Sequence, residues 1–264
     1  MADVRASTFT HTLAILANKG LRYSTVIDLG CADGHFFVEH YMRGFFSESV
    51  PVNIDANALY EPSLKAIQEV LDGHYRIAAA SDKGGEIELT TSIHPYWSSL
   101  RSSGDWYWER IQKTTSGTRI VPAVRLDDLA ADLKLAPPYL LKLDIQGAEV
   151  QALRGARRVL SETDVIICEA DMADFQAINS EITSAGFDLY DITHLSYAAD
   201  QSLGWFYPVY LSARKAHLIE RSFWRDSDTE AIINLQITRR QGILKGLADA
   251  LPKIRAAKQP KNSN

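Results

Sequence analysis

The chain has 264 residues, of which 46% are hydrophobic and 23% charged, and its formal net charge is −5. This balance excludes a disordered chain and a collagen-like chain. The sequence contains no run of about 18 uncharged apolar residues, so it predicts no membrane-spanning helix. The apolar run from Leu13 to Ala17 is too short for the core of a signal peptide. We expect the two cysteines, Cys31 and Cys168, to be reduced thiols in a cytoplasmic protein.

The charge is distributed unevenly along the chain. Residues 239–264 contain seven lysines and arginines and one acidic residue, so the rest of the chain is more acidic than the total suggests. An acidic body predicts that the protein does not bind nucleic acid, because phosphate contacts need a basic surface. We expect the basic residues to form a solvated terminal helix, with an acidic partner as the alternative. The sequence leaves the oligomeric state open.

Short β-rich runs alternate with helical patterns along the first 80 residues. This alternation predicts a parallel sheet covered by helices. Buried runs predict strands at 24–29, 50–55 and 75–80. The spacing of apolar residues predicts helices that begin near Gly34 and near Pro62.

The alternation breaks over residues 81–126, where we expect an insert. Two strands, at 86–90 and 119–126, enclose a loop that is too long for a simple connection. This loop holds five of the aromatic residues, for which we weigh two roles: a lid that stacks on a flat or sugar-like acceptor, or an anchor to the core. The five are Tyr96, Trp97, Trp106, Tyr107 and Trp108.

After the insert the alternation resumes and then ends in two consecutive strands. The strand patterns at 186–192 and 205–212 have no helix between them, which predicts an antiparallel hairpin at one edge of the sheet. From about residue 217 the pattern is helical and polar. We therefore expect a domain over 1–215 and a helical extension over 216–264. The other elements expected here are strand 139–144, helix 147–160, strand 164–168 and helix 172–185.

A glycine-rich turn, VIDLGCADGHF, follows the first strand. Glycines in a strand–turn–helix context let the backbone approach a nucleotide closely. The turn lacks the dinucleotide pattern G-x-G-x-x-G, because Ala32 stands at the middle position. Its acids, Asp28 and Asp33, would repel a pyrophosphate and would suit a cation such as the ammonium group of S-adenosylmethionine. The expected cofactor contacts in the turn are Asp28, Gly30, Cys31, Ala32, Asp33 and Gly34.

Acids also follow the next two strands. Asp55 ends the second strand, where a carboxylate can accept hydrogen bonds from both ribose hydroxyls. Ser81 and Asp82 end the third strand, where the edge of a base would lie. The alternative is that Asp33 only caps a helix and Asp55 only caps a turn. Acids at three neighbouring strand ends favour a shared site.

Two segments resemble a known family. DLGCADG resembles motif I of class I S-adenosylmethionine-dependent methyltransferases, and LKLDIQGAEVQALRGA is similar to the signature block of FkbM-type methyltransferases. AASDKGG (79–85) and VRLDDL (124–129) also resemble family segments, so the resemblance spans about 26–212. The residues that match the family pattern K-x-D-x-x-G-x-E and its closing G-A are Lys142, Asp144, Gly147, Glu149, Gly155 and Ala156.

The resemblance implies both a fold and an activity. The implied fold is α/β: a Rossmann-like, doubly wound, seven-stranded and mostly parallel sheet with an antiparallel last strand. The implied activity is S-adenosylmethionine-dependent methyl transfer to a hydroxyl of a sugar, glycan or secondary metabolite. Two alternatives stay open: an NAD-binding oxidoreductase, against which the missing glycine pattern argues, and a non-catalytic binding protein on a methyltransferase fold.

A hydroxyl acceptor needs a group that takes its proton. Asp144 ends the fourth strand beside the expected methyl position, so it is a candidate both for cofactor contact and for catalysis. Lys142 points to the same face, and a buried lysine needs a carboxylate partner. Lys142, Glu169 and His194 are further catalytic candidates.

Three other features admit more than one interpretation. Glu149 is either a glutamate favoured by the helix dipole or a catalytic residue. A Mg²⁺ ion could be held by the carboxylate oxygens of Asp144, Glu169 and Asp171, but we do not favour this site. His94 is a weaker candidate base.

Overall fold

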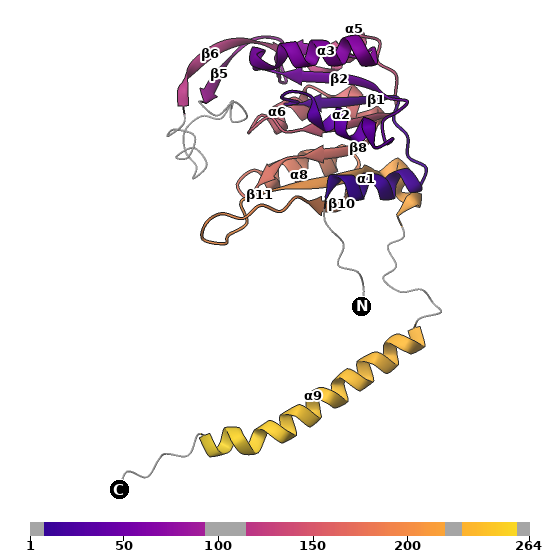
Figure 1. The fold of residues 1–264 in the computed structure, drawn as a ribbon, viewed down its shortest axis with the longest axis vertical. Helices are drawn as coiled ribbons and strands as arrows, with labels where there is room; N and C mark the ends of the chain where they lie inside the picture. Colours follow the sequence, from indigo (N-terminus) through magenta and orange to yellow (C-terminus); the bar gives the residue numbers. More distant parts are fainter. Residues whose placement is uncertain (1–7, 93–114, 220–228, 258–264) are drawn as a thin grey trace. The chain divides into compact units, whose positions relative to one another are not determined.

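The structure is a computed structural model that describes residues 8–92, 115–219 and 229–257. The chain divides into two units, Met1–Leu218 and Ile219–Asn264, which we describe separately. The first unit contains the sheets and all helices up to residue 218 (Figure 1). The aromatic loop at 94–110, including His94, lies outside the described residues.

The first unit is built on a mostly parallel sheet, in the order β10-β11-β8-β7-β1-β2-β3. The pairs β7–β8, β7–β1, β1–β2 and β2–β3 are parallel, whereas β11 is antiparallel to both β8 and β10. This confirms the expected sheet with its antiparallel last strand. The short β9 (Ala170–Asp171) also pairs with β11. The strands are β1 (Thr25–Leu29), β2 (Val50–Asp55), β3 (His74–Ile77), β7 (Tyr139–Leu143), β8 (Thr163–Cys168), β10 (Phe187–Thr193) and β11 (Trp205–Ser212).

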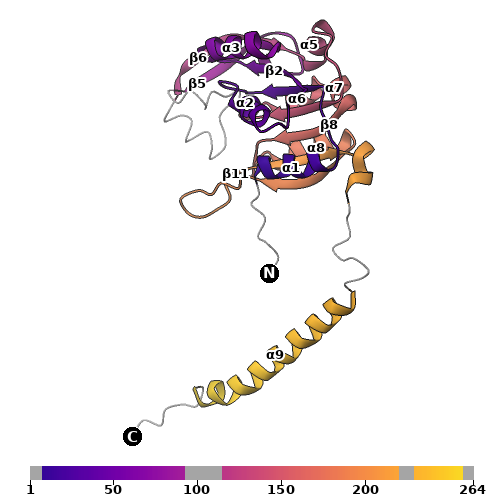
Figure 2. The ribbon, with the colours of Figure 1, turned by 45° about the vertical axis from the view of Figure 1, so that its right-hand side comes forward.

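Helices connect these strands. Figure 1 shows α3 beside β2 at one end of the unit and α1 beside β10 at the other. Figure 2 shows α3 and α1 at the same two ends after a turn of 45°. Between β10 and β11 the described chain has no helix, as the sequence predicted. The α-helices of this unit are α1 (Phe9–Asn18), α2 (His35–Met42), α3 (Glu61–Leu71), α5 (Leu126–Asp132), α6 (Glu149–Arg154), α7 (Arg157–Glu162) and α8 (Phe175–Ser184), with 3-10 turns η1 (Ala58–Tyr60) and η3 (Ala213–Leu218).

The central strands are buried on both faces, which is why they read as continuous apolar runs. On one face, Ile27 and Leu141 belong to a core cluster that includes Leu153 and Ile178 from α6 and α8. Alternate residues point to the opposite face. On that face the ammonium of Lys142 lies 5.6 Å from the ring centre of Phe36 in α2. The side chain of Lys142 is buried, as are the apolar residues of the same strand.

The predicted third strand is wrong in extent. The chain leaves the main sheet after Ile77 and enters a second, three-stranded sheet at β4 (Ala79–Ala80). In this sheet, β6 (Thr115–Val124) pairs with both β4 and β5 (Gly85–Ser92). The insert strands are therefore confirmed, except that Leu126 begins α5 instead of ending a strand.

The predicted helix at 147–160 is also wrong, because it is two helices. α6 ends at Arg154 and α7 begins at Arg157. A side chain at Gly155 would place its Cβ 2.1 Å from the carbonyl oxygen of Ser81. The break thus lets the helix backbone pack directly on the segment after β4. The pattern of apolar residues carries no sign of this contact.

The second unit contains α9 (Thr229–Ala257), a helix of 29 residues. Apolar side chains such as Ile233, Ile237 and Leu244 are exposed on it. Among the helices that the structure describes, none is both long and apolar enough to cross a membrane.

Candidate active site

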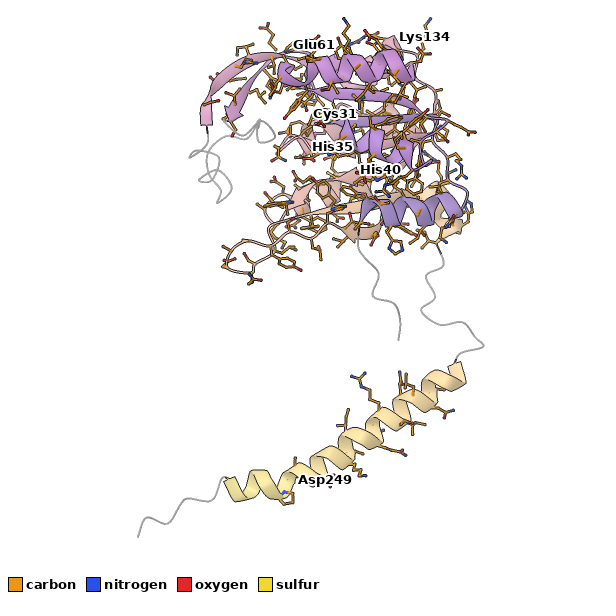
Figure 3. All side chains as sticks on the ribbon, viewed as in Figure 1. Cys31, His35, His40, Glu61, Lys134 and Asp249 are labelled. Atoms are coloured by element: carbon orange, nitrogen blue, oxygen red, sulfur yellow. The ribbon has the colours of Figure 1, made fainter. Side chains whose placement is uncertain are left out.

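The glycine-rich turn lies where β1 ends and α2 begins, at the edge where the parallel strands finish, which we call the carboxyl edge. Gly30, Ala32 and Gly34 all adopt left-handed backbone angles, with φ of +70°, +48° and +82°. A Cβ added at Gly30 would lie 1.9 Å from the backbone oxygen of Asp144. Figure 3 labels Cys31 in the turn, with His35 and His40 following along α2. The turn is therefore packed against the segment that follows β7.

The backbone amides of the turn are used within the protein. Gly30 N and Cys31 N donate to the carbonyl oxygen of Ile54, at 2.8 and 3.3 Å. Ala32 N donates to Oδ2 of Asp55 at 2.8 Å. A pyrophosphate binds bare amides at such a turn. Because these three are already occupied, the turn is poorly suited to a dinucleotide.

Asp33 lies at the start of α2 and is partly exposed. Its Oδ1 accepts from the backbone N of His35 at 3.2 Å and lies 2.8 Å from Nδ1 of the same residue. This is a turn in which the aspartate side chain accepts from the backbone two residues on, and it precedes the helix, whose N-cap residue is Gly34. The carboxylate nevertheless faces solvent at the turn, with 43% of its side chain exposed.

Asp28 is fully buried below the turn. Its Oδ1 accepts from Nζ of Lys142 at 3.0 Å, and its Oδ2 has no hydrogen-bond partner within the described chain. Burial raises the pKa of Asp28 even though the charge of Lys142 lowers it. Asn53, opposite Asp28 on β2, also buries an unpartnered Oδ1. Two buried acceptor oxygens favour a cation above them and disfavour an anion.

Asp55 ends β2 next to the turn. Its two oxygens accept from the backbone N of Ala32 and of Asn57, each at 2.8 Å. Burial raises the pKa of Asp55, and these two amides lower it by less. Each carboxylate oxygen has a second lone pair, so Asp55 is held in place while it can still accept from a ligand.

Ser81 and Asp82 follow β4 and not the end of a main-sheet strand, which corrects their expected position. The hydroxyl of Ser81 donates to Oδ1 of Asp82 at 3.3 Å, and its backbone N donates to Val124. Ser81 is buried because Gly155 packs against it.

Lys142 has a carboxylate partner, as the sequence predicted, and in fact it joins two carboxylates. Its Nζ lies 3.0 Å from Oδ1 of Asp28 and 3.5 Å from Oδ2 of Asp144. Burial alone would lower the pKa of Lys142, but the charges of Asp28 and Asp144 outweigh it and raise that pKa above its usual value. Lys142 therefore stays charged in the core.

Asp144 and Glu169 form a partly buried carboxyl pair. Nε2 of Gln146 donates to both, at 3.0 Å to Asp144 Oδ1 and 2.5 Å to Glu169 Oε2. The hydroxyl of Tyr207 lies 2.9 Å from Asp144 Oδ2 and 3.3 Å from Glu169 Oε1. Sequence reasoning missed Gln146 and Tyr207. Gln146 stands inside the DIQGAE block, but Tyr207 reaches the pair only because β11 folds back beside β8.

The two carboxyls differ in acidity. Burial acts to raise the pKa of Asp144, but Lys142 and hydrogen bonds with Glu169, Tyr207 and Gln146 together lower it. For Glu169, burial and then the neighbouring charge of Asp144 raise the pKa well above its usual value. The pair thus separates into a stronger and a weaker acid.

His194 lies near this pair but is bonded to the N-terminal helix. Its Nε2 accepts from the backbone N of Phe9 at 3.1 Å, and the two rings lie 3.9 Å apart. Phe9 also contacts Tyr207 edge-on, with ring centres 4.7 Å apart. Burial lowers the pKa of His194 more than Glu39 raises it. The neutral imidazole is therefore an anchor for α1 here, and α1 was missed by the sequence patterns.

Two further acids have structural partners. Glu149 is buried, and its carboxylate accepts from the backbone N of Ile145 and Gly147 at 3.1 and 2.9 Å. Asp171 accepts from two amides of its own turn, at 2.8 and 2.9 Å. Across residues 8–92, 115–219 and 229–257, no group of three or more His, Cys, Asp or Glu side chains is placed to hold a metal ion. The three carboxylates considered for Mg²⁺ thus do not assemble in this part of the chain.

Solved structures with a similar fold include several methyltransferases. A methyltransferase FkbM from Methylobacillus flagellatus KT aligns at 15% identity and a TM-score of 0.45, over 71% of this chain and 43% of that one. Fibrillarin from Aeropyrum pernix, solved with natively bound S-adenosyl-L-methionine, aligns at 13% identity and 0.42, over 75% and 74%. A precorrin-6y C5,15-methyltransferase from Geobacter metallireducens GS-15 aligns at 8% identity and 0.41, over 80% and 90%. The chain thus spans less than half of the first of these proteins.

A search of curated proteins found no matching relative. The family model described as the methyltransferase FkbM domain matches residues 11–189. This match covers more than half of the chain. It begins within α1 and ends within β10, so it starts and stops earlier than the resemblance seen in the sequence. The chain therefore belongs to the FkbM methyltransferase domain family.

Proposed function

We propose that the protein transfers a methyl group from S-adenosylmethionine to a hydroxyl oxygen of a sugar, glycan or secondary metabolite. One observation carries the proposal: acids from three neighbouring parallel strands meet at the glycine-rich turn. These are Asp55 at the end of β2, Asp28 in β1 and Asp144 directly after β7. The proposal assigns this activity to residues 1–215 and treats 216–264 as a separate extension.

The residues of the turn fit this cofactor better than a dinucleotide. S-adenosylmethionine supplies a methyl group on a positively charged sulfur, together with an ammonium group and two ribose hydroxyls. Under the proposal, Asp55 accepts from the ribose hydroxyls, while the turn and its acids hold the cationic part. Support comes from the unpartnered buried oxygen of Asp28 and from turn amides already bonded to Ile54 and Asp55. Ser81 and Asp82 are the proposed contacts for the base.

Asp144 is the proposed base. It lies beside the turn, with Lys142 favouring its charged form. A hydroxyl is a weak nucleophile until its proton is removed. The acceptor proton would move to a carboxylate oxygen of Asp144 as the acceptor oxygen forms its new bond to carbon. The surrounding side chains position both groups and exclude water.

Asp55→Ala should weaken binding of S-adenosylhomocysteine, the demethylated product. Loss of charge-assisted hydrogen bonds costs about 1.5–3 kcal/mol, or roughly a 10- to 150-fold rise in Kd. Calorimetric titration measures the change. Asp72→Asn is the matched control, because Asp72 is an exposed acid at the end of α3. An unchanged Kd for Asp55→Ala would remove Asp55 from the site.

Asp144→Asn should lower turnover by roughly 100-fold or more, the usual scale for loss of a general base, with S-adenosylhomocysteine affinity changed only a few-fold. The assay follows labelled methyl from S-adenosylmethionine onto a panel of sugars and hydroxylated secondary metabolites. Wild-type turnover in this variant would reject Asp144 as the base. Labelling confined to nitrogen acceptors would reject the hydroxyl specificity.

A further inference from the structure

The carboxyl groups of Asp144 and Glu169, next to the turn, share more hydrogen-bond partners than a single catalytic base requires. Asp144 follows β7, Glu169 follows β8, and Tyr207 comes from β11. We propose that Asp144 and Glu169 act as one proton-sharing pair, in which Glu169 is the neutral acid and Asp144 the carboxylate, and that Tyr207 is the positioning residue that joins them. This inference rests on the proposed function and assigns its proton-handling group.

Counting donors supports one shared proton. Tyr207 has a single hydroxyl proton, yet its oxygen lies within hydrogen-bond distance of Asp144 Oδ2 and Glu169 Oε1. Both contacts are hydrogen bonds only if one carboxyl donates. The two carboxyls also act on each other, because Asp144 raises the pKa of Glu169 while Glu169 lowers that of Asp144. Gln146 does not supply the missing proton between Tyr207 and the carboxyls, because its amide nitrogen donates to the other oxygen of each carboxyl, Asp144 Oδ1 and Glu169 Oε2.

The surrounding charges decide which carboxyl holds the proton. Lys142 lies 3.5 Å from Asp144 Oδ2, so it favours the charged form there. Glu169 instead faces further acidic groups. The titratable groups that act on the pair are Lys142 on β7, Asp28 on β1, Glu149 on α6, Cys168 on β8 and Tyr207 on β11, with His194 packed behind Tyr207. If Glu169 were charged as well as Asp144, the single ammonium of Lys142 would have to balance the charges of Asp28, Asp144 and Glu169. The proton therefore belongs on Glu169.

The pair would give the base a fixed geometry and a defined charge. In the resting state it carries one proton and one negative charge. When the acceptor O–H bond breaks, its proton moves to Asp144, and the oxygen electron pair forms the new bond to the methyl carbon. The carbon–sulfur bond breaks with its electron pair on sulfur. The pair then holds two protons and releases one to water before the next turnover.

Carbon-13 NMR of protein labelled at the Glu and Asp carboxyl carbons tests this directly. Glu169→Gln assigns the Glu169 signal by its loss. We expect that signal to keep the chemical shift of a neutral acid well above pH 4.5, while the Asp144 signal titrates below 3.8. A Glu169 signal that titrates like an exposed glutamate would overturn the proposal.

Tyrosine variants test the positioning role. Tyr207→Phe should move the Asp144 titration to higher pH, because it removes a hydrogen bond to the charged form. Tyr210→Phe, on the same strand, removes a hydroxyl that bonds Asn179 instead and should leave both carboxyl signals unchanged. Equal shifts in the two variants, or none in Tyr207→Phe, would contradict the role. S-adenosylhomocysteine titration of each variant is independent of these shifts, so failure of the cofactor site would be seen separately.

The stability of Glu169→Gln gives a second readout. A neutral Glu169 binds a proton that the unfolded chain releases above its usual pKa. Wild-type stability should therefore fall as pH rises above about 4.5. Glu169→Gln keeps the shape and removes the titration, so its melting temperature should fall less between pH 5 and 8. A slope equal to that of wild type would overturn the assignment of the proton to Glu169.

Discussion

Gly30→Ala should destabilise the protein by about 2–5 kcal/mol and abolish binding of S-adenosylhomocysteine. The left-handed backbone at Gly30 costs an alanine about 1–2 kcal/mol, and overpacking typically adds 1–3 kcal/mol. The overpacking arises because the new Cβ would lie 1.9 Å from the backbone oxygen of Asp144. This oxygen belongs to main chain and cannot rotate away. The turn and the segment after β7 would have to separate, and the proposed base moves with that segment.

Gly44→Ala is the matched control for this substitution. Gly44 has a similar φ of +81°, but an added Cβ meets nothing within 4 Å. The loss should be limited to the backbone term of about 1–2 kcal/mol. Urea unfolding measures both variants, and calorimetric titration measures cofactor affinity. Similar losses in the two glycine variants would show that the turn and the segment after β7 are not tightly packed.

Lys142→Met should cost about 3–5 kcal/mol at neutral pH, which is typical for the loss of one partner of a buried ion pair. The substitution leaves the buried Asp28 and the partly buried Asp144 without their cation. It should also raise the pKa of both acids. A buried acid with a raised pKa destabilises the fold as pH rises, so the deficit should be largest near pH 7 and smaller near pH 4–5.

Arg43→Met controls for removal of a surface charge. Arg43 pairs with Glu39 one helical turn away, and both side chains are about half exposed. Such pairs contribute about 0.3–0.5 kcal/mol. Unfolding at several pH values measures the two variants. If Lys142→Met lost no more stability than Arg43→Met, or lost the same amount at every pH, Lys142 would not form a charged pair with Asp28 and Asp144 in the folded protein.

The parallel strands were predictable because a strand that is buried on both faces reads as a continuous run of apolar residues. The patterns at 24–29, 50–55 and 164–168 match β1, β2 and β8 to within one residue. The hairpin of β10 and β11 was predictable because no helical pattern separates them. The break in the α6–α7 region and the exit of the chain after Ile77 were not, since both depend on contacts between distant segments.

The candidate site also has parts that were predictable from the sequence and parts that were not. The partner of Lys142 was predictable because an isolated charge in an apolar strand is costly. Asp28 and Asp55 were expected at the carboxyl edge, and the structure brings both to the turn. Tyr207 could not be predicted, because its role depends on β11 lying between β8 and β10. The bond between His194 and Phe9 likewise joins residues 185 positions apart.

The measurement that tests the central claim most directly is calorimetric titration of the purified protein with S-adenosylhomocysteine, with NADH in a parallel cell. We predict micromolar binding of S-adenosylhomocysteine and no binding of NADH, with the first lost in Gly30→Ala and weakened in Asp55→Ala. Binding of NADH alone would contradict the account, because the turn would then hold a dinucleotide despite its occupied amides. Binding of neither would remove the turn from catalysis and favour a non-catalytic binding protein on this fold.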